Sequence, residues 1–184
     1  MQLLRTLRLI GLGLSVIPAA KTQKASTSGT LNVQLTNTSA IVMLLNSNPN
    51  GIALGNTGTS AATMNFGTVS DYNSSPATGV TVKSGKTSFT ASSPFDIRIE
   101  MSGSSSTSYT LSAALASTAP TGITIDLNST TLTTTAQTIT ATGSYFSNTS
   151  HTLKLIISTA APGSGGPVTG TQFTSTIDLT ATAN

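Results

Sequence analysis

The sequence FDIRIEM, which runs from Phe95 to Met101, decides the fold class, because apolar and charged side chains alternate along it without a break. Successive side chains of a β-strand point to opposite faces, so a period of two predicts a strand with one apolar and one charged face. Such a strand is typical of an antiparallel sheet that covers a core on one side and meets water on the other.

The same alternation recurs on both sides of this segment, with Gly, Pro, Asn and Ser clusters between the repeats. The run from Ala40 to Leu45 is apolar throughout, which predicts a strand buried on both faces. Turn signals at this spacing indicate an all-β fold. We expect about eight to ten strands in an antiparallel two-sheet sandwich of the immunoglobulin-like or pilin-like kind. Further strands are expected at residues 31–35, 63–69, 80–82, 109–115, 123–127, 139–141, 153–157 and 173–181.

The composition favours a packed domain over a disordered stalk, and it is unlike that of a typical cytosolic enzyme. About a third of the 184 residues are Ser or Thr, and only 7% are charged, where about a quarter is usual. With 37% hydrophobic residues in periodic runs, the chain contains enough apolar surface for a core. There is no Cys, which excludes a disulfide framework and a thiolate metal site.

The first twenty residues have the pattern of a secretory signal peptide. A short positive segment ends at Arg8, an apolar run follows from Leu9 to Ile17, and Pro18 precedes two alanines. We therefore expect residues 1–20 to be a signal peptide. We expect residues 21–184 to form one secreted domain, with a loose polar extension at residues 21–29. The alternative for this segment is an N-terminal membrane anchor. No later apolar run is long enough to span a membrane.

The net charge of +3 comes mainly from this N-terminal segment. Without Arg5 and Arg8, six basic residues stand against five acidic ones, and the basic residues are scattered. Such a weak positive charge argues against a nucleic-acid partner.

The chain contains a single histidine, His151, at the start of an expected strand. A catalytic histidine needs a nucleophile and an acid placed around it, and in a serine-rich chain any pairing on paper is uninformative. We expect His151 to be a surface residue in a loop or at a strand edge. No catalytic residue, metal ion or cofactor is expected.

The acidic residues also predict no catalytic site. Asp96 and Glu100 are separated by roughly 13 Å along an extended strand, which is too far for a glycosidase pair, and Arg98 lies between them. We expect a solvated row of charges here. A calcium loop containing Asp71 has too few acids. Lys154 alternates with apolar neighbours and should face solvent, which disfavours an internal amide cross-link.

Three features resemble bacterial fimbrial-type subunits. They are the alternating segment from Thr30 to Leu45 behind a polar extension, the phrase MNFGTV at residues 64–69, and the final strand from Ile177 to Asn184. The resemblance implies an incomplete immunoglobulin-like fold that is completed by a strand from a neighbouring subunit. Missing cysteines, and the distance of the last aromatic residue, Phe173, from the C-terminus, depart from the pattern.

In that family the N-terminal segment is the donated strand. The resemblance therefore implies that Leu31, Val33 and Leu35 fill an apolar groove of the next subunit. The alternative is that these three residues form an ordinary strand within their own domain, and the sequence does not choose between the two.

The expected function is that of a non-catalytic structural subunit of a surface filament (fimbria or pilus) or coat. Its expected partners are copies of itself or related subunits, together with a secretion chaperone. The alternative is a cell-surface adhesin or carbohydrate-binding module, in which Tyr72 and Tyr145 are the candidate glycan contacts, since Tyr109 should point inward. A secreted hydrolase has the least support.

Overall fold

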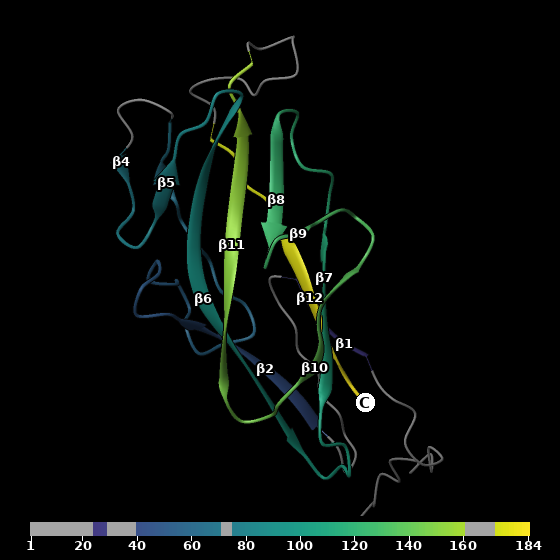
Figure 1. Ribbon diagram of the computed structural model, residues 1–184. Helices are drawn as coiled ribbons and strands as arrows, with labels where there is room; N and C mark the ends of the chain where they lie inside the picture. Colours follow the sequence, from purple (N-terminus) through teal and green to yellow (C-terminus); the bar gives the residue numbers. More distant parts are fainter. Residues whose placement is uncertain (1–23, 29–39, 71–74, 161–171) are drawn as a thin grey trace, which may run out of the picture.

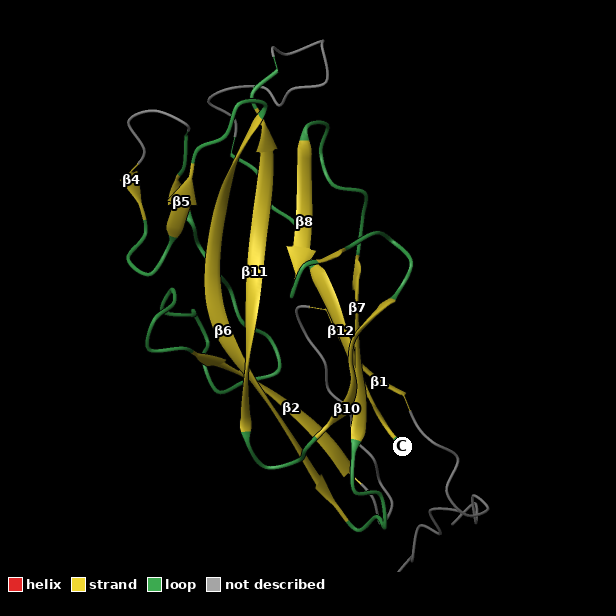
Figure 2. Ribbon diagram, in the orientation of Figure 1, coloured by secondary structure: helices red, strands yellow, loops and turns green. Residues whose placement is uncertain are grey.

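The computed structural model describes residues 24–28, 40–70, 75–160 and 172–184. Within these ranges the chain is all β and contains no helix (Figure 2), as the sequence predicts. The strands are β1 (Lys24–Ser28), β2 (Ala40–Ser47), β3 (Gly67–Thr68), β4 (Ser75–Pro76), β5 (Thr81–Lys83), β6 (Ser88–Ser102), β7 (Tyr109–Leu115), β8 (Ile123–Leu127), β9 (Thr130–Thr131), β10 (Gln137–Gly143), β11 (Asn148–Ser158) and β12 (Ile177–Ala183).

Among the described residues all strand pairs are antiparallel, and they form three sheets. The four-stranded sheet has the order β1-β12-β7-β10, and the six-stranded sheet has the order β2-β6-β11-β8-β9, with β5 also paired to β6. β3 and β4 form a separate small hairpin. Figure 1 shows β6 and β11 side by side as the long strands of the six-stranded sheet.

The alternation in Phe95–Met101 gives β6 two distinct faces, as expected. Ile97 and Ile99 have no exposed surface, whereas Arg98 and Glu100 on the opposite face are half-exposed. The strand is 15 residues long because it pairs with β11 on one side, and with β5 and then β2 on the other.

One buried cluster contains residues from both larger sheets. Tyr109 belongs to it and is 0% exposed, which confirms the inward orientation predicted for this residue. Its ring lies directly over Gly143 in β10, where a Cβ atom would collide with it. The other large contributors are Ile41, Met43, Phe95, Ile97, Ile99, Leu111, Leu115, Ile125, Leu127 and Leu179.

Two sequence-based expectations about strands are wrong. β2 is not buried on both faces, because Val42 is 43% exposed while Ile41 and Met43 are buried. β2 is the last strand on its side of the described sheet, and a continuous apolar run does not reveal that position. The expected strand at residues 63–69 is reduced to β3, two residues long.

The N-terminal region differs from expectation where it is described. Residues 21–29 were expected to be a loose extension, but Lys24–Ser28 form β1 and pair with β12. The predicted signal peptide at residues 1–20 lies outside the described residues. A search of the described part of the chain finds no helix that is long and apolar enough to cross a membrane.

Candidate functional site

The β1–β12 pair forms one side of the four-stranded sheet. Within the described residues β1 is the last strand there, and the chain ends nearby (Figure 1). The antiparallel register sets Ala25 opposite Ala181 and Thr27 opposite Leu179. Residues directly opposite one another share a face of the sheet, so Ala25 and Thr27 occupy positions on the face where Leu179 and Ala181 are buried.

β12 contributes two buried residues at this edge, Leu179 and Ala181, and its partner strand has a small, polar sequence. β1 reads KASTS, so its two core-side positions hold an alanine and a threonine. Asp178, which lies opposite Ser28, has a buried Oδ1 atom without a hydrogen-bond partner among the described residues. β1 therefore extends the backbone pairing of this sheet, and its sequence contains no large apolar residue.

Several predicted site residues lie outside the described residues. They include the candidate strand-donor residues Leu31, Val33 and Leu35, the candidate glycan contact Tyr72, and the calcium-loop residue Asp71. Among the residues that the structure does describe, no three His, Asp or Glu side chains lie close enough together to hold a metal ion.

His151 is not at the surface, contrary to expectation. It is 1% exposed, because its register with Phe95 in β6 places it on the core side of the six-stranded sheet. The centroids of the two rings are 6.0 Å apart. Burial lowers the pKa of His151 below its ordinary value of 6.5, and the nearby Asp96 carboxylate opposes that shift.

The hydrogen bond of His151 is to an amide. Its Nδ1 atom lies 2.8 Å from Nδ2 of Asn128, in the turn between β8 and β9. The Asn128 Oδ1 atom accepts the backbone N–H of Thr152 at 2.9 Å. The Nε2 atom of His151 is buried and has no partner among the described residues. Among the described residues, neither a serine hydroxyl nor a carboxylate is hydrogen-bonded to this imidazole.

The acidic row on β6 is only partly solvated. Arg98 and Glu100 form the expected surface ion pair, with Nε 2.8 Å from Oε1 and both side chains more than a third exposed. Such a pair contributes little to stability. Asp96, however, is only 9% exposed and accepts a hydrogen bond of 2.7 Å from Asn48. The loop after β2 covers this carboxylate, which the strand pattern alone could not show.

Lys154 in β11 lies on the face opposite its apolar neighbours, and its side chain is 33% exposed. Its Nζ atom is 2.8 Å from Oδ2 of Asp126, a residue of β8 that is only 4% exposed. Thr131 donates a hydrogen bond of 2.8 Å to the other oxygen of this carboxylate. The buried charge of Asp126 is therefore neutralised by one lysine and oriented by one hydroxyl.

The two aromatic residues before β11 have different environments. Tyr145 is half-buried, and its hydroxyl donates to the backbone oxygen of Ser108 at 2.8 Å. Phe146 is 58% exposed and has a φ angle of +65°, a left-handed conformation that is uncommon for a bulky residue. Tyr145 thus links two loops, whereas the aromatic ring of Phe146 is exposed to solvent.

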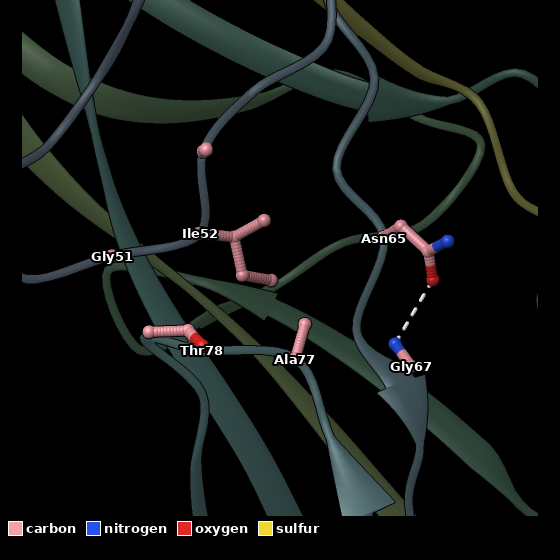
Figure 3. Close-up of a pocket in the computed structure, with 7 residues that line it drawn as sticks. Gly51, Ile52, Asn65, Gly67, Ala77 and Thr78 are labelled. Carbon is pink, nitrogen blue, oxygen red and sulfur yellow. Dashed lines mark hydrogen bonds between the residues drawn. The ribbon is translucent and has the colours of Figure 1, made fainter.

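A shallow pocket of about 390 Å³ lies between the loop after β2 and the β3–β4 hairpin (Figure 3). It is lined by residues 51–53, by Asn65 and Gly67, and by Ala77 and Thr78. The Asn65 side chain accepts the backbone N–H of Gly67 at 2.9 Å. None of these lining residues is ionisable, so the pocket provides no acid–base chemistry.

Comparison with known proteins gives no match to a protein-family model, to a curated protein or to a solved structure.

Sequence reasoning missed three features of these sites. The burial of His151 was detectable, because it has the same parity as Leu153 in an alternating strand. The role of Asn128 depends on a turn between two strands and has no sequence signal beyond the residue type. The exposure of Phe146 had no signal, since an aromatic residue beside a strand is usually buried.

Proposed function

We propose that the chain is a non-catalytic, exported structural subunit of a surface filament or coat, with its two larger sheets packed as an immunoglobulin-like sandwich. Subunits would join by β-strand donation at the edge of β12. Its partners would be copies of itself or related subunits, delivered by a secretion chaperone. The shared core cluster supports the sandwich, and the β1–β12 edge carries the assembly proposal.

The supporting observation is the contrast between the two strands of that edge. β12 contributes the buried residues Leu179 and Ala181, and β1 sets only Thr27 and Ala25 opposite them. A strand of another chain could take the place of β1 with the same backbone hydrogen bonds. The exchange leaves the fold unchanged and needs only a strand with larger apolar side chains at the two positions opposite Leu179 and Ala181.

The sequence contains a segment with such side chains a few residues after β1. Leu31, Val33 and Leu35 alternate with polar residues, so a strand built from them would direct three large apolar side chains to one face. Burying one such side chain contributes roughly 1.5–3 kcal/mol, far more than an alanine or threonine at the same position. Donation of this segment by a neighbour would therefore be favoured over self-pairing of β1.

Electron microscopy of the purified full chain should show fibres, and a strictly monomeric protein would contradict the proposal.

Because the chain has no native cysteine, a disulfide between Ala25→Cys and Ala181→Cys can lock β1 onto its own β12. Directly opposed residues of an antiparallel pair are within disulfide distance. The oxidised double variant should form no fibres, and reduction should restore them. Ala25→Cys alone is the matched control.

A second candidate function, glycan binding by a surface adhesin, is favoured by Phe146. An exposed aromatic ring held in a left-handed turn costs conformational energy, and such strain is often retained for a binding role. A glycan array on the full chain should give hits that Phe146→Ala abolishes. Tyr145→Phe, which keeps the ring, should preserve them. An array without hits would reject this candidate and leave the filament proposal untouched.

A further inference from the structure

The hydrogen bonds around His151 fix the position of its proton. The backbone N–H of Thr152 must face an oxygen, so it fixes the Asn128 amide with Oδ1 toward β11 and Nδ2 toward the imidazole. An amide NH₂ group can only donate, so Nδ1 of His151 must accept. The proton of the neutral imidazole is therefore on Nε2, where it is buried without a partner among the described residues.

A second proton would have to enter at Nδ1, and there it would face another donor. Protonation thus removes the Asn128 hydrogen bond and places a charge in a site that is 1% exposed. Asn128 and Ser129 both have left-handed φ angles, of +51° and +67°, which cost conformational energy. The hydrogen bonds of Asn128 are therefore needed to hold the turn in this conformation. The backbone N–H of Asn128 also donates to the Thr152 oxygen at 3.0 Å.

The charged groups near His151 do not compensate for this loss. Asp96, in β6, is one residue beyond its register partner and attracts a proton to the imidazole, but burial has the larger effect. Asp126 in β8 and Lys154 in β11 neutralise each other. The core-side residues of the four-stranded sheet that faces this core are uncharged among those described: Tyr109, Leu111, Ala113, Leu115, Leu179 and Ala181.

We propose that His151 makes the edge of the six-stranded sheet acid-sensitive: protonation at Nδ1 breaks the bond to Asn128 and releases the β8–β9 turn from β11. Because the pKa in the fold lies below 6.5, the stabilising contribution of the neutral histidine is complete above that pH. The contribution is lost as the pH falls from there toward the folded-state pKa. The response is local, since the β9 strand beyond the turn is only two residues long.

An NMR titration of the wild-type chain directly tests where the His151 proton lies and whether the pKa is lowered. The chain has only one histidine, so the imidazole signals are unambiguous. At neutral pH the proton should be on Nε2, and the midpoint of the titration should lie below 6.5. A proton on Nδ1, or a midpoint at or above that value, would overturn the proposal.

Hydrogen exchange of the Thr152 and Leu132 amides tests the release. After correction for intrinsic exchange, both rates should rise roughly tenfold between about pH 7 and about pH 5, because each unit of pH below the unfolded-state pKa changes the equilibrium up to tenfold. In His151→Asn the side-chain oxygen can accept from Asn128 and does not titrate, so the rise should vanish. An equal rise in both proteins would refute the switch. If His151→Asn does not fold, the wild-type rates must begin to rise near pH 6.5 and level off below the histidine midpoint found by NMR, and a rise over any other pH range refutes the proposal equally.

Discussion

The β9 edge of the six-stranded sheet and the β1 edge of the four-stranded sheet are held in different ways. β9 has only two residues, yet side-chain bonds fix the turn before it: Thr131 to Asp126, and Asn128 to His151. β1 has five residues in register with β12, but its core-side positions hold only small side chains.

The number of paired residues is therefore a poor measure of how firmly an edge is fixed. A short strand tied by buried polar groups is costly to move, because each broken bond leaves a buried donor or acceptor unsatisfied. Under the proposed assembly, β1 is exchanged for the strand of another chain, and the same backbone hydrogen bonds re-form with β12. The first three predictions below test this difference and the fourth tests two tyrosine hydroxyls, beginning with the largest effect.

The largest effect is expected from Lys154→Met. Asp126 would be left as a buried charge without its cation, and the free energy of unfolding should fall by about 3 kcal/mol. Urea unfolding followed by circular dichroism measures the change. Adding Asp126→Asn to the same chain should recover most of the loss, and an unchanged deficit in the double variant would show that Lys154 acts through packing instead.

Asn128→Ala should destabilise the protein by about 2 kcal/mol, because two side-chain hydrogen bonds and a residue suited to a left-handed φ are lost. Asn128→Gly loses the same bonds but tolerates the backbone angle, so it should be the milder variant. Thermal unfolding at neutral pH ranks the two. If Asn128→Gly is less stable than Asn128→Ala, the left-handed φ of residue 128 is not a source of strain.

Proline substitution contrasts an edge strand with an interior strand of one sheet. Ser26→Pro in β1 should cost less than about 1 kcal/mol, because the register directs its N–H away from β12. Thr180→Pro in β12, whose N–H pairs with β7, should cost about 2 kcal/mol. Chemical denaturation of both variants gives the difference. Similar losses would mean that β1 is as firmly integrated as β12.

The smallest effects are expected at two tyrosine hydroxyls. The Tyr109 hydroxyl is buried without a partner among the described residues, so Tyr109→Phe should change stability by less than about 0.5 kcal/mol. Tyr145→Phe loses a bond to the Ser108 backbone and should cost about 1 kcal/mol. Equilibrium unfolding distinguishes them, and a larger loss at Tyr109 would reveal a partner for its hydroxyl.

The sequence predicts most of the strands, because apolar alternation follows directly from burial of one sheet face. Ile97 and Ile99, the inward Tyr109 and the solvated Arg98–Glu100 pair all follow from that rule. The rule fails for β2, since a continuous apolar run does not distinguish an edge strand from a central one.

The candidate sites were predicted less well, because they depend on contacts between distant segments. Asp96 is buried by Asn48 from a loop 48 residues earlier, and His151 is bound by Asn128 from a different strand pair. No local pattern encodes either contact. The position of the N-terminal strand was also missed, since the polar residues Lys24–Ser28 lack the apolar alternation that marks a strand.

The most direct test of strand donation at the β1 edge uses two single-cysteine chains, one with Val33→Cys in the proposed donor segment and one with Ala181→Cys in β12. Neither chain alone can form a disulfide between these two positions, so a heterodimeric disulfide requires the donor segment of one chain to lie beside the β12 of another. After co-assembly and oxidation, the account predicts disulfide-linked pairs of the two chains, made only from the mixture and reduced in amount by Leu31→Ser. Assembled fibres that yield no such pair would contradict exchange at this edge.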